Sequence, residues 1–188
     1  METLILASAS PRRSELLSHA GIPFEVRAAE VDEHCDCPAA EAVRILSSRK
    51  AQAVKALFPG RFILAADTLV ELDGRVLGKP SGPEEAADML RRLSGHTHQV
   101  YTGVTVVNPA GDILTDSDCS DVTFGEISES EIAAYVASGE PLDKAGAYAL
   151  QGRASLWVSR LEGSYSSVIG LPLFLVRKLL LQSGYHIN

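Results

Sequence analysis

The chain has 188 residues, of which 46% are hydrophobic and 22% charged, a composition typical of a globular protein with one substantial core. Its formal net charge of −7 argues against a nucleic-acid partner, so a polyanionic ligand must bind a local group of cations. No apolar run approaches the roughly 18 residues of a membrane helix, and the start lacks the features of a secretion signal, so we expect a cytoplasmic protein with no membrane partner.

Apolar periodicity and the placement of Gly, Pro and Ser predict alternating strands and helices. In the first half we predict a strand at 3–7, a helix from Pro11 to before Gly21, a strand at Phe24–Arg27, a helix from about Ala39 to Phe58, and a strand at Phe62–Ala66 that runs into a hairpin turned by Asp73-Gly74. In the second half we predict a helix from Pro83 to near Ser94, strands at 98–107 and 113–124, a helix from Ser128 to about Ser138, a strand at 154–161 and a helix from about Leu171 to Gln182. This mixture favours an α/β or mixed α+β fold with a mixed sheet, in a single domain spanning residues 1–188.

Two arginines occupy the first turn of the first helix, in the stretch LILASASPRRSELL. Ser10 suits the N-cap position and Pro11 the first helical position. Arg12 and Arg13 are unfavourable there, because the helix N-terminus already carries partial positive charge. A bound anion would remove the conflict, and the hydroxyl of Ser8 would add a donor. The pattern therefore indicates a phosphate-binding turn, with two solvated guanidiniums as the alternative.

Two carboxylates and two lysines extend this pattern. Asp67 ends the apolar run FILAA, where a partly desolvated carboxylate either pairs with a cation or titrates abnormally, unless it serves only as a turn residue. Glu33 offers a second carboxylate, and together the two could hold a hard divalent cation. Lys50 on the long helix and Lys79 after the hairpin are unremarkable singly, but the whole set resembles a triphosphate site.

Two common phosphate motifs are absent from the sequence. The segment DGRVLGKP resembles part of a P-loop, but its glycines are too close together and Pro80 stands where a magnesium-binding hydroxyl belongs. No G-x-G-x-x-G follows any predicted strand, so a dinucleotide-binding fold has no support.

The cysteines and histidines predict no further site. Three cysteines without signs of export argue against a disulfide framework, and the run from His34 to Cys37 suggests a polar loop more than a zinc site. His96 and His98 alternate along a predicted strand, so we expect them to share a solvated face.

Taken in order, the motifs of this chain resemble those of the Maf family of nucleotide pyrophosphatases. They are S-x-S-P-R-R-x-E-L-L, V-D-E, R-K-A, A-A-D-T, G-K-P, L-S-G-x-T-H-x-V and DKAGAYALQG, and they span roughly residues 3–182. The resemblance implies a mixed-sheet fold similar to that of the inosine triphosphatases, with two lobes flanking a deep cleft. It also implies hydrolysis of a nucleoside triphosphate to the monophosphate and pyrophosphate, dependent on a divalent cation such as Mg²⁺ or Mn²⁺, and leaves a homodimer open.

The resemblance assigns roles to individual positions. Ser8, Arg12 and Arg13 match the family's phosphate-binding turn; Glu33, Lys50, Asp67 and Lys79 match its polar catalytic cleft; and Arg12, Thr68 and Gln151 match positions tied to substrate choice. Asp67 matches the proton acceptor, although it could equally be a metal ligand together with Glu33. The AYALQG segment resembles the branch that acts on dTTP and UTP in house-cleaning of pyrimidine nucleotides. The alternatives are the 7-methyl-GTP branch and a nucleotide-binding regulator of septum formation.

Overall fold

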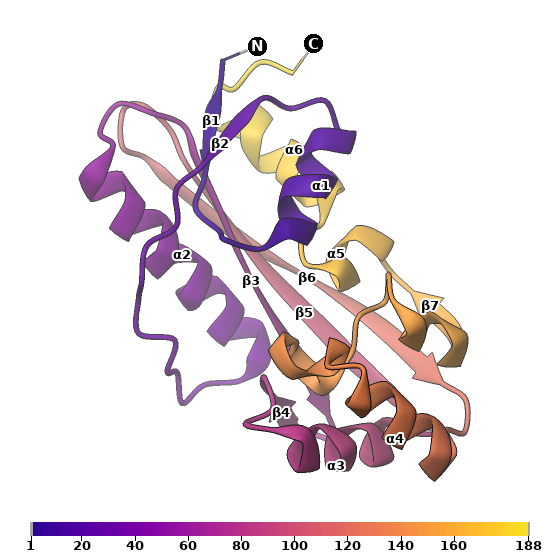
Figure 1. Ribbon diagram of the computed structural model, residues 1–188. Helices are drawn as coiled ribbons and strands as arrows, with labels where there is room; N and C mark the ends of the chain where they lie inside the picture. Colours follow the sequence, from indigo (N-terminus) through magenta and orange to yellow (C-terminus); the bar gives the residue numbers. More distant parts are fainter. Residues whose placement is uncertain (1, 188) are drawn as a thin grey trace. The chain divides into compact units, whose positions relative to one another are not determined.

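The structure, a computed structural model, describes residues 2–187 and confirms the mixed α/β class (Figure 1). The strands are β1 Leu4–Leu6, β2 Phe24–Val26, β3 Ile63–Leu72, β4 Arg75–Leu77, β5 Thr97–Val107, β6 Ile113–Phe124 and β7 Val158–Glu162. The α-helices are α1 Pro11–His19, α2 Ala39–Leu57, α3 Pro83–Leu93, α4 Glu129–Ala137, α5 Tyr165–Ile169 and α6 Leu173–Gln182, and the 3₁₀ segments are η1 Glu140–Asp143, η2 Ala145–Ala147 and η3 Arg153–Trp157. Within residues 2–187, no helix combines the length and the apolar character that a membrane crossing requires.

The strands form one mixed sheet in the order β2-β1-β3-β5-β6-β7, with β4 paired to β3. β1 runs parallel to β2 and β3, whereas the β3–β4 and β6–β7 pairs are antiparallel. Leu6 of β1 lies beside Leu64 of β3. Because the carboxyl ends of parallel strands meet at one edge of a sheet, Ser8 after β1 and Asp67 in β3 are brought to the same neighbourhood.

The chain forms two compact units. The first comprises the residues up to Asp67, Thr102–Asp118 and the residues from Gly170 onward; the second comprises Thr68–Tyr101 and Cys119–Ile169. β3, β5 and β6 contribute residues to both units. A single domain over residues 1–188, with lobes flanking a cleft, stays a prediction.

The first unit has a core of aliphatic side chains between α2 and the sheet. Its buried members are Ile5, Ala7, Ala51, Val54, Ile63, Ala65 and Val107. Ala51 and Val54 come from α2 at a spacing of three residues, which places them on one face of that helix. The opposite positions of α2 are free to carry polar side chains.

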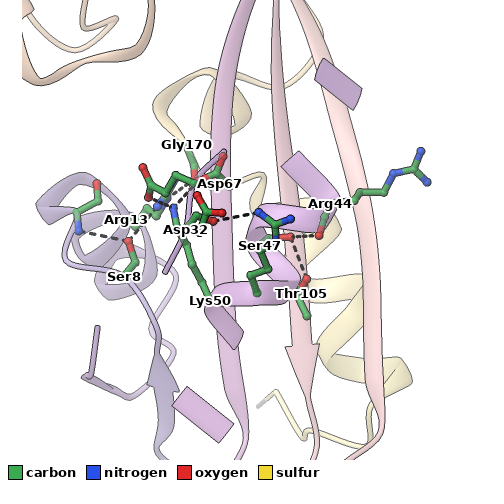
Figure 2. Close-up of polar contacts among 12 residues, drawn as sticks. Ser8, Arg13, Asp32, Arg44, Ser47, Lys50, Asp67, Thr105 and Gly170 are labelled. Atoms are coloured by element: carbon green, nitrogen blue, oxygen red, sulfur yellow. Dashed lines mark hydrogen bonds and ion pairs between the residues drawn. The ribbon is translucent and has the colours of Figure 1, made fainter. Parts of the chain in front are cut away.

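Helix α2 approaches β5 closely. A Cβ atom on Gly103 would lie 2.1 Å from the main-chain oxygen of Val43, so only the hydrogen of glycine fits there. The hydroxyl of Ser47 lies 2.9 Å from that of Thr105, and both residues are fully buried (Figure 2). These contacts fix the position of α2 at Val43 and Ser47, and Ser47 lies within one turn of Lys50.

The second unit is built on aromatic rings. Phe124 packs edge-to-face against Tyr148 and Trp157, with ring centroids 4.9 and 6.2 Å apart, and Tyr135 packs against Trp157 at 5.0 Å. Such pairs contribute about 0.5–1.5 kcal/mol each beyond their buried area. The buried apolar residues of α3 complete this core; they are Ala86, Met89, Leu90 and Leu93.

His98 is buried in this core, so the predicted solvated face for the two histidines is wrong. His96 is exposed and precedes β5, which begins at Thr97. His98 is 0% exposed, and its Nε2 lies 2.8 Å from the hydroxyl of Tyr148. Burial lowers the pKa of His98 to about 4, so the ring is neutral at pH 7. The aromatic neighbours, which are distant in sequence, decide its environment.

The segment after the AYALQG motif also differs from the prediction. Residues 153–157 form the 3₁₀ helix η3, and the strand predicted from residue 154 begins only at Val158. Ala154 and Trp157 are the buried residues of η3, and their spacing of three residues is the repeat of a 3₁₀ helix. The short helix α5 was not predicted.

We expect Gly103→Ala to destabilise the first unit, because its Cβ would collide with main-chain atoms of α2. Overpacking of this kind costs about 1–3 kcal/mol in the free energy of unfolding. Urea unfolding measures the change. Gly125→Ala is the matched control, since its Cβ would meet no atom closer than 3.8 Å. Equal midpoints for the two variants would contradict the close approach of α2 to β5.

Candidate functional site

Arg13 is held at the start of α1 by two hydrogen bonds (Figure 2). Its Nε donates to the main-chain oxygen of Gly170 at 2.8 Å, and its Nη1 donates to the hydroxyl of Ser8 at 2.9 Å. Ser8 is buried, and its hydroxyl also accepts the N–H of Ser10 at 3.3 Å. The predicted turn therefore exists as a hydrogen-bonded structure in which Arg13 faces the loop after β1.

Ser10 occupies the N-cap position, but its side chain makes no capping hydrogen bond. Ser10 therefore has the predicted N-cap position without the predicted side-chain hydrogen bond. Its main-chain N–H donates to the hydroxyl of Ser8 instead. Half-buried Arg12 follows Pro11 in the first turn. The first turn of α1 thus presents main-chain N–H groups and cations without an acidic residue, as anion binding requires.

The charge state of Arg13 reflects this environment. Burial lowers the pKa of Arg13 below its ordinary value, the carboxylate of Asp67 raises it, and the like charge of Arg12 lowers it. Glu33 raises the pKa of Arg13 as well. An arginine remains protonated at neutral pH, so the turn keeps its positive charge. These effects also place the Arg13 guanidinium within electrostatic reach of both carboxylates.

Lys50 joins the two predicted carboxylates. Its Nζ lies 2.5 Å from Oδ1 of Asp67 and 2.7 Å from Oε1 of Glu33. Asp67 is 7% exposed, whereas the Glu33 side chain is 54% exposed. Because a carboxylate removed from water needs a cation or hydrogen-bond donors, Lys50 allows Asp67 to remain buried in β3. The structure therefore brings Glu33, Lys50 and Asp67 together, and their catalytic roles stay predictions.

Arg49 positions Glu33, and sequence reasoning missed it. Its Nη1 donates to the main-chain oxygens of Asp32 and His34, at 3.0 and 2.8 Å. These two carbonyls flank Glu33 in a loop without regular secondary structure. Arg49 therefore holds the main chain of the loop, while the adjacent Lys50 binds its side chain. Arg49 is part of the R-K-A motif, but only Lys50 of that motif was predicted as a site residue.

The cysteines correct another expectation. Cys35 and Cys37 form a disulfide bond with each other, although the odd number of cysteines argued against disulfides. The bond joins residues two positions apart in the same loop, so it does not link separate elements. The remaining residue, Cys119, is an exposed thiol.

The other three predicted site residues belong to the second unit. Thr68 is half-buried in β3, directly after Asp67. Lys79 is exposed after β4, and it follows Gly78, whose carbonyl accepts the N–H of Gly146 at 3.1 Å. Gln151 is exposed in the AYALQG segment. Their proposed roles stay predictions.

The donor set of the first unit fits a hard divalent cation. Magnesium is usually held by one or two carboxylates together with waters and substrate phosphates. Glu33 and Asp67 are two such carboxylates meeting at one point, where they bind the ammonium of Lys50. Among residues 2–187, no group of three or more His, Cys, Asp or Glu side chains could hold a metal ion. A divalent cation held by Glu33 and Asp67 stays a prediction.

Known proteins resemble this chain in sequence and in fold. The family model described as Maf-like protein matches residues 3–183. The dTTP/UTP pyrophosphatase of Symbiobacterium thermophilum is 50% identical, over 100% of this chain and 97% of that protein. The dTTP/UTP pyrophosphatase of Moorella thermoacetica is 51% identical, over 96% of this chain and 94% of that protein. The solved structure of the Staphylococcus aureus Ham1 protein shares the fold, with a TM-score of 0.55 and 14% identity over 96% of this chain and 99% of that one.

The two arginines of the turn should respond differently to truncation. Arg13→Ala removes the bonds to Gly170 and Ser8, so we expect it to lower the free energy of unfolding by about 1–3 kcal/mol and to weaken binding of a polyphosphate. Within residues 2–187, Arg12 makes no hydrogen bond to the main chain like that of Arg13 to Gly170. Arg12→Ala should therefore weaken polyphosphate binding with little change in the free energy of unfolding. Urea unfolding and titration with inorganic tripolyphosphate measure both effects. Equal destabilisation by the two variants would contradict the structural role of Arg13.

Proposed function

Because the chain belongs to the Maf family, we propose that it hydrolyses dTTP and UTP to the nucleoside monophosphate and pyrophosphate. One observation carries the chemistry: a cationic turn follows β1, and a lysine-paired carboxylate lies within β3, the strand that runs parallel to β1. Two relatives with half of their residues identical, over nearly their whole lengths, bear the name dTTP/UTP pyrophosphatase. These relatives support the pyrimidine branch over the 7-methyl-GTP branch.

Cations of the first unit would neutralise the triphosphate. Arg13 is held by main-chain and hydroxyl acceptors, so its position requires little rearrangement when the substrate arrives. Arg12 and Lys50 add two further charges, and Lys79 of the second unit matches the same role in the family. Fixed positive charges of this kind stabilise the negative charge that develops on the departing pyrophosphate, the largest contribution expected in phosphoryl transfer.

Asp67 is the group proposed to activate the attacking water. Its Oδ1 accepts a hydrogen bond from Lys50, which leaves Oδ2 as the oxygen that would take the proton of a water in line with the α-phosphate. Attack at the α-phosphorus would then break its bond to the bridging oxygen and release pyrophosphate.

Glu33 and Asp67 are the residues that would hold a divalent cation, Mg²⁺ or Mn²⁺. When bound, such a cation polarises phosphoryl oxygens and neutralises their charge. Glu33 is the more exposed of the two carboxylates, and Arg49 restrains the loop that carries it. That restraint would fix the orientation of the carboxylate before the substrate arrives.

Gln151 is proposed to read the base. Its amide offers a donor and an acceptor, and uracil and thymine present an N3 donor beside carbonyl acceptors. Cytosine presents an acceptor at N3 next to an amino group, so the same amide would leave polar groups unmatched unless it flipped. A mismatch of this type costs about 1–3 kcal/mol, or about 5- to 150-fold in kcat/KM.

We expect Asp67→Asn to lower kcat by about 10²- to 10⁴-fold, the contribution of a general base. Nucleotide affinity should stay near that of the wild type or increase, because one negative charge facing the polyanion is removed. Single-turnover hydrolysis of dTTP and calorimetric titration with a non-hydrolysable analogue separate the two effects.

Asp73→Asn is the control for this substitution, since Asp73 lies in the exposed β3–β4 turn at φ 50, a conformation that asparagine tolerates. It should leave turnover unchanged. Turnover by Asp67→Asn close to that of this control would refute the role of Asp67.

We expect dTTP and UTP to be hydrolysed with kcat/KM about 5- to 150-fold above that of CTP, for the reason given for Gln151. Pyrophosphate release from dTTP, UTP, CTP, ATP, GTP and 7-methyl-GTP, with magnesium and with EDTA, is the measurement. Loss of turnover in EDTA, restored by added Mg²⁺ or Mn²⁺, is the expected metal dependence. A preference for GTP or 7-methyl-GTP would contradict the proposed substrate class.

A further inference from the structure

The hydroxyl of Tyr135 connects helix α4 to the AYALQG segment. Tyr135 is 1% exposed, and its ring packs edge-to-face on Trp157 with centroids 5.0 Å apart. Its hydroxyl donates to Oε1 of Glu140 at 3.0 Å and accepts the main-chain N–H of Ala149 at 3.2 Å. All four residues belong to the second unit. A buried main-chain N–H, two residues before Gln151, is therefore paired with a side chain and not with regular secondary structure.

The direction of this hydrogen-bond chain follows from the chemistry of its members. An ionised carboxylate only accepts hydrogen bonds, so the single hydroxyl proton of Tyr135 points to Glu140. The oxygen of Tyr135 is then left to accept from Ala149, and its polarisation by a charged acceptor strengthens that bond. The hydrogen bonds of Tyr135 to Glu140 and to Ala149 thus depend on each other. Loss of either Tyr135 or Glu140 would weaken the restraint on the main chain at Ala149.

The same carboxylate borders the other side of Gln151. A Cβ atom on Gly152 would lie 1.7 Å from Oε1 of Glu140, so the carboxylate fills the space against this glycine. The exposed Gln151 therefore lies between Ala149, which is bonded to Tyr135, and Gly152, which packs on Glu140. Contacts on both sides restrain the main chain that carries Gln151.

The beginning of the segment is fixed separately. The N–H of Gly146 donates to the oxygen of Gly78 at 3.1 Å, and the hydroxyl of Tyr148 lies 2.8 Å from His98. Ala147 has φ 57, an uncommon conformation for a residue with a side chain, which persists only where the surroundings determine it. These contacts hold residues 146–148, whereas Tyr135 and Glu140 hold residues 149–152.

We propose that Tyr135 and Glu140 are positioning residues for base choice: their hydrogen-bond chain to Ala149 sets the orientation of Gln151, and with it the discrimination of uracil and thymine from cytosine. This inference rests on the proposed hydrolysis of dTTP and UTP. Neither residue needs to touch the nucleotide. They act through the main chain of the 149–152 segment, and they leave the phosphate-binding groups of the first unit unchanged.

Tyr135→Phe tests the proposal, because it keeps the ring on Trp157 and removes only the hydroxyl. The N–H of Ala149 would lose its partner, so we expect the ratio of kcat/KM for UTP to that for CTP to fall by about 5- to 100-fold. The KM for UTP should rise while kcat changes little. The inhibition constant of inorganic tripolyphosphate, a probe without a base, should stay within about twofold of the wild type, since only base recognition is altered.

Two further variants keep the test independent of folding defects. Tyr165→Phe removes a hydroxyl from a 57% exposed residue of α5 and should leave the UTP to CTP ratio unchanged. Glu140→Ala removes the acceptor of the chain from a half-buried position, and it should lower the ratio in the same direction as Tyr135→Phe. Because both act through one chain, the double variant should lower the ratio by less than the product of the single effects.

The outcomes separate this inference from the function on which it rests. A wild-type protein without preference for UTP and dTTP would overturn the proposed function and the inference together. A wild-type preference that survives in both Tyr135→Phe and Glu140→Ala would overturn the inference alone. Equal weakening of UTP and tripolyphosphate binding in these variants would indicate a general structural defect and would also overturn it.

Discussion

Lys50 holds its ammonium 2.5 Å from Asp67 and 2.7 Å from Glu33, and this contact joins a loop, a helix and a strand that are distant in sequence. The contact exists because α2 is seated tightly on β5, where Gly103 admits the main chain of the helix and Ser47 bonds to the strand. A buried carboxylate without its cation would destabilise the fold. The proposed water-activating group is therefore also part of what holds the first unit together.

The phosphate turn shows the same overlap of stability and function. Arg13 satisfies a main-chain carbonyl and the Ser8 hydroxyl, yet it also places a second cation beside Arg12 at a helix N-terminus. Two like charges there oppose each other and the helix dipole, and a bound anion would relieve that repulsion. Asp67 and Glu33 compensate part of the charge from outside the turn. Local rules of helix formation are broken where the ligand is proposed to bind, as is expected at functional sites.

Local patterns in the sequence predicted the elements well, because apolar periodicity and turn residues act over short distances. They also indicated Arg12 and Arg13, which are cations at a helix N-terminus, and Asp67, which is a carboxylate directly after an apolar run. Contacts between distant segments were missed, among them the close approach at Gly103 and the burial of His98 against Tyr148. A glycine or a histidine looks the same in a sequence whether it faces water or another element, so those roles required the assembled fold.

In the proposed reaction, water activated beside Asp67 attacks the α-phosphorus of a pyrimidine nucleoside triphosphate. Hydrolysis of dTTP in ¹⁸O-labelled water, followed by mass spectrometry of the products, tests it most directly. We expect one ¹⁸O atom in dTMP and none in pyrophosphate, because attack at the α-phosphorus leaves the new oxygen on the monophosphate. Label in pyrophosphate, or release of labelled orthophosphate with dTDP, would contradict attack at the α-phosphorus.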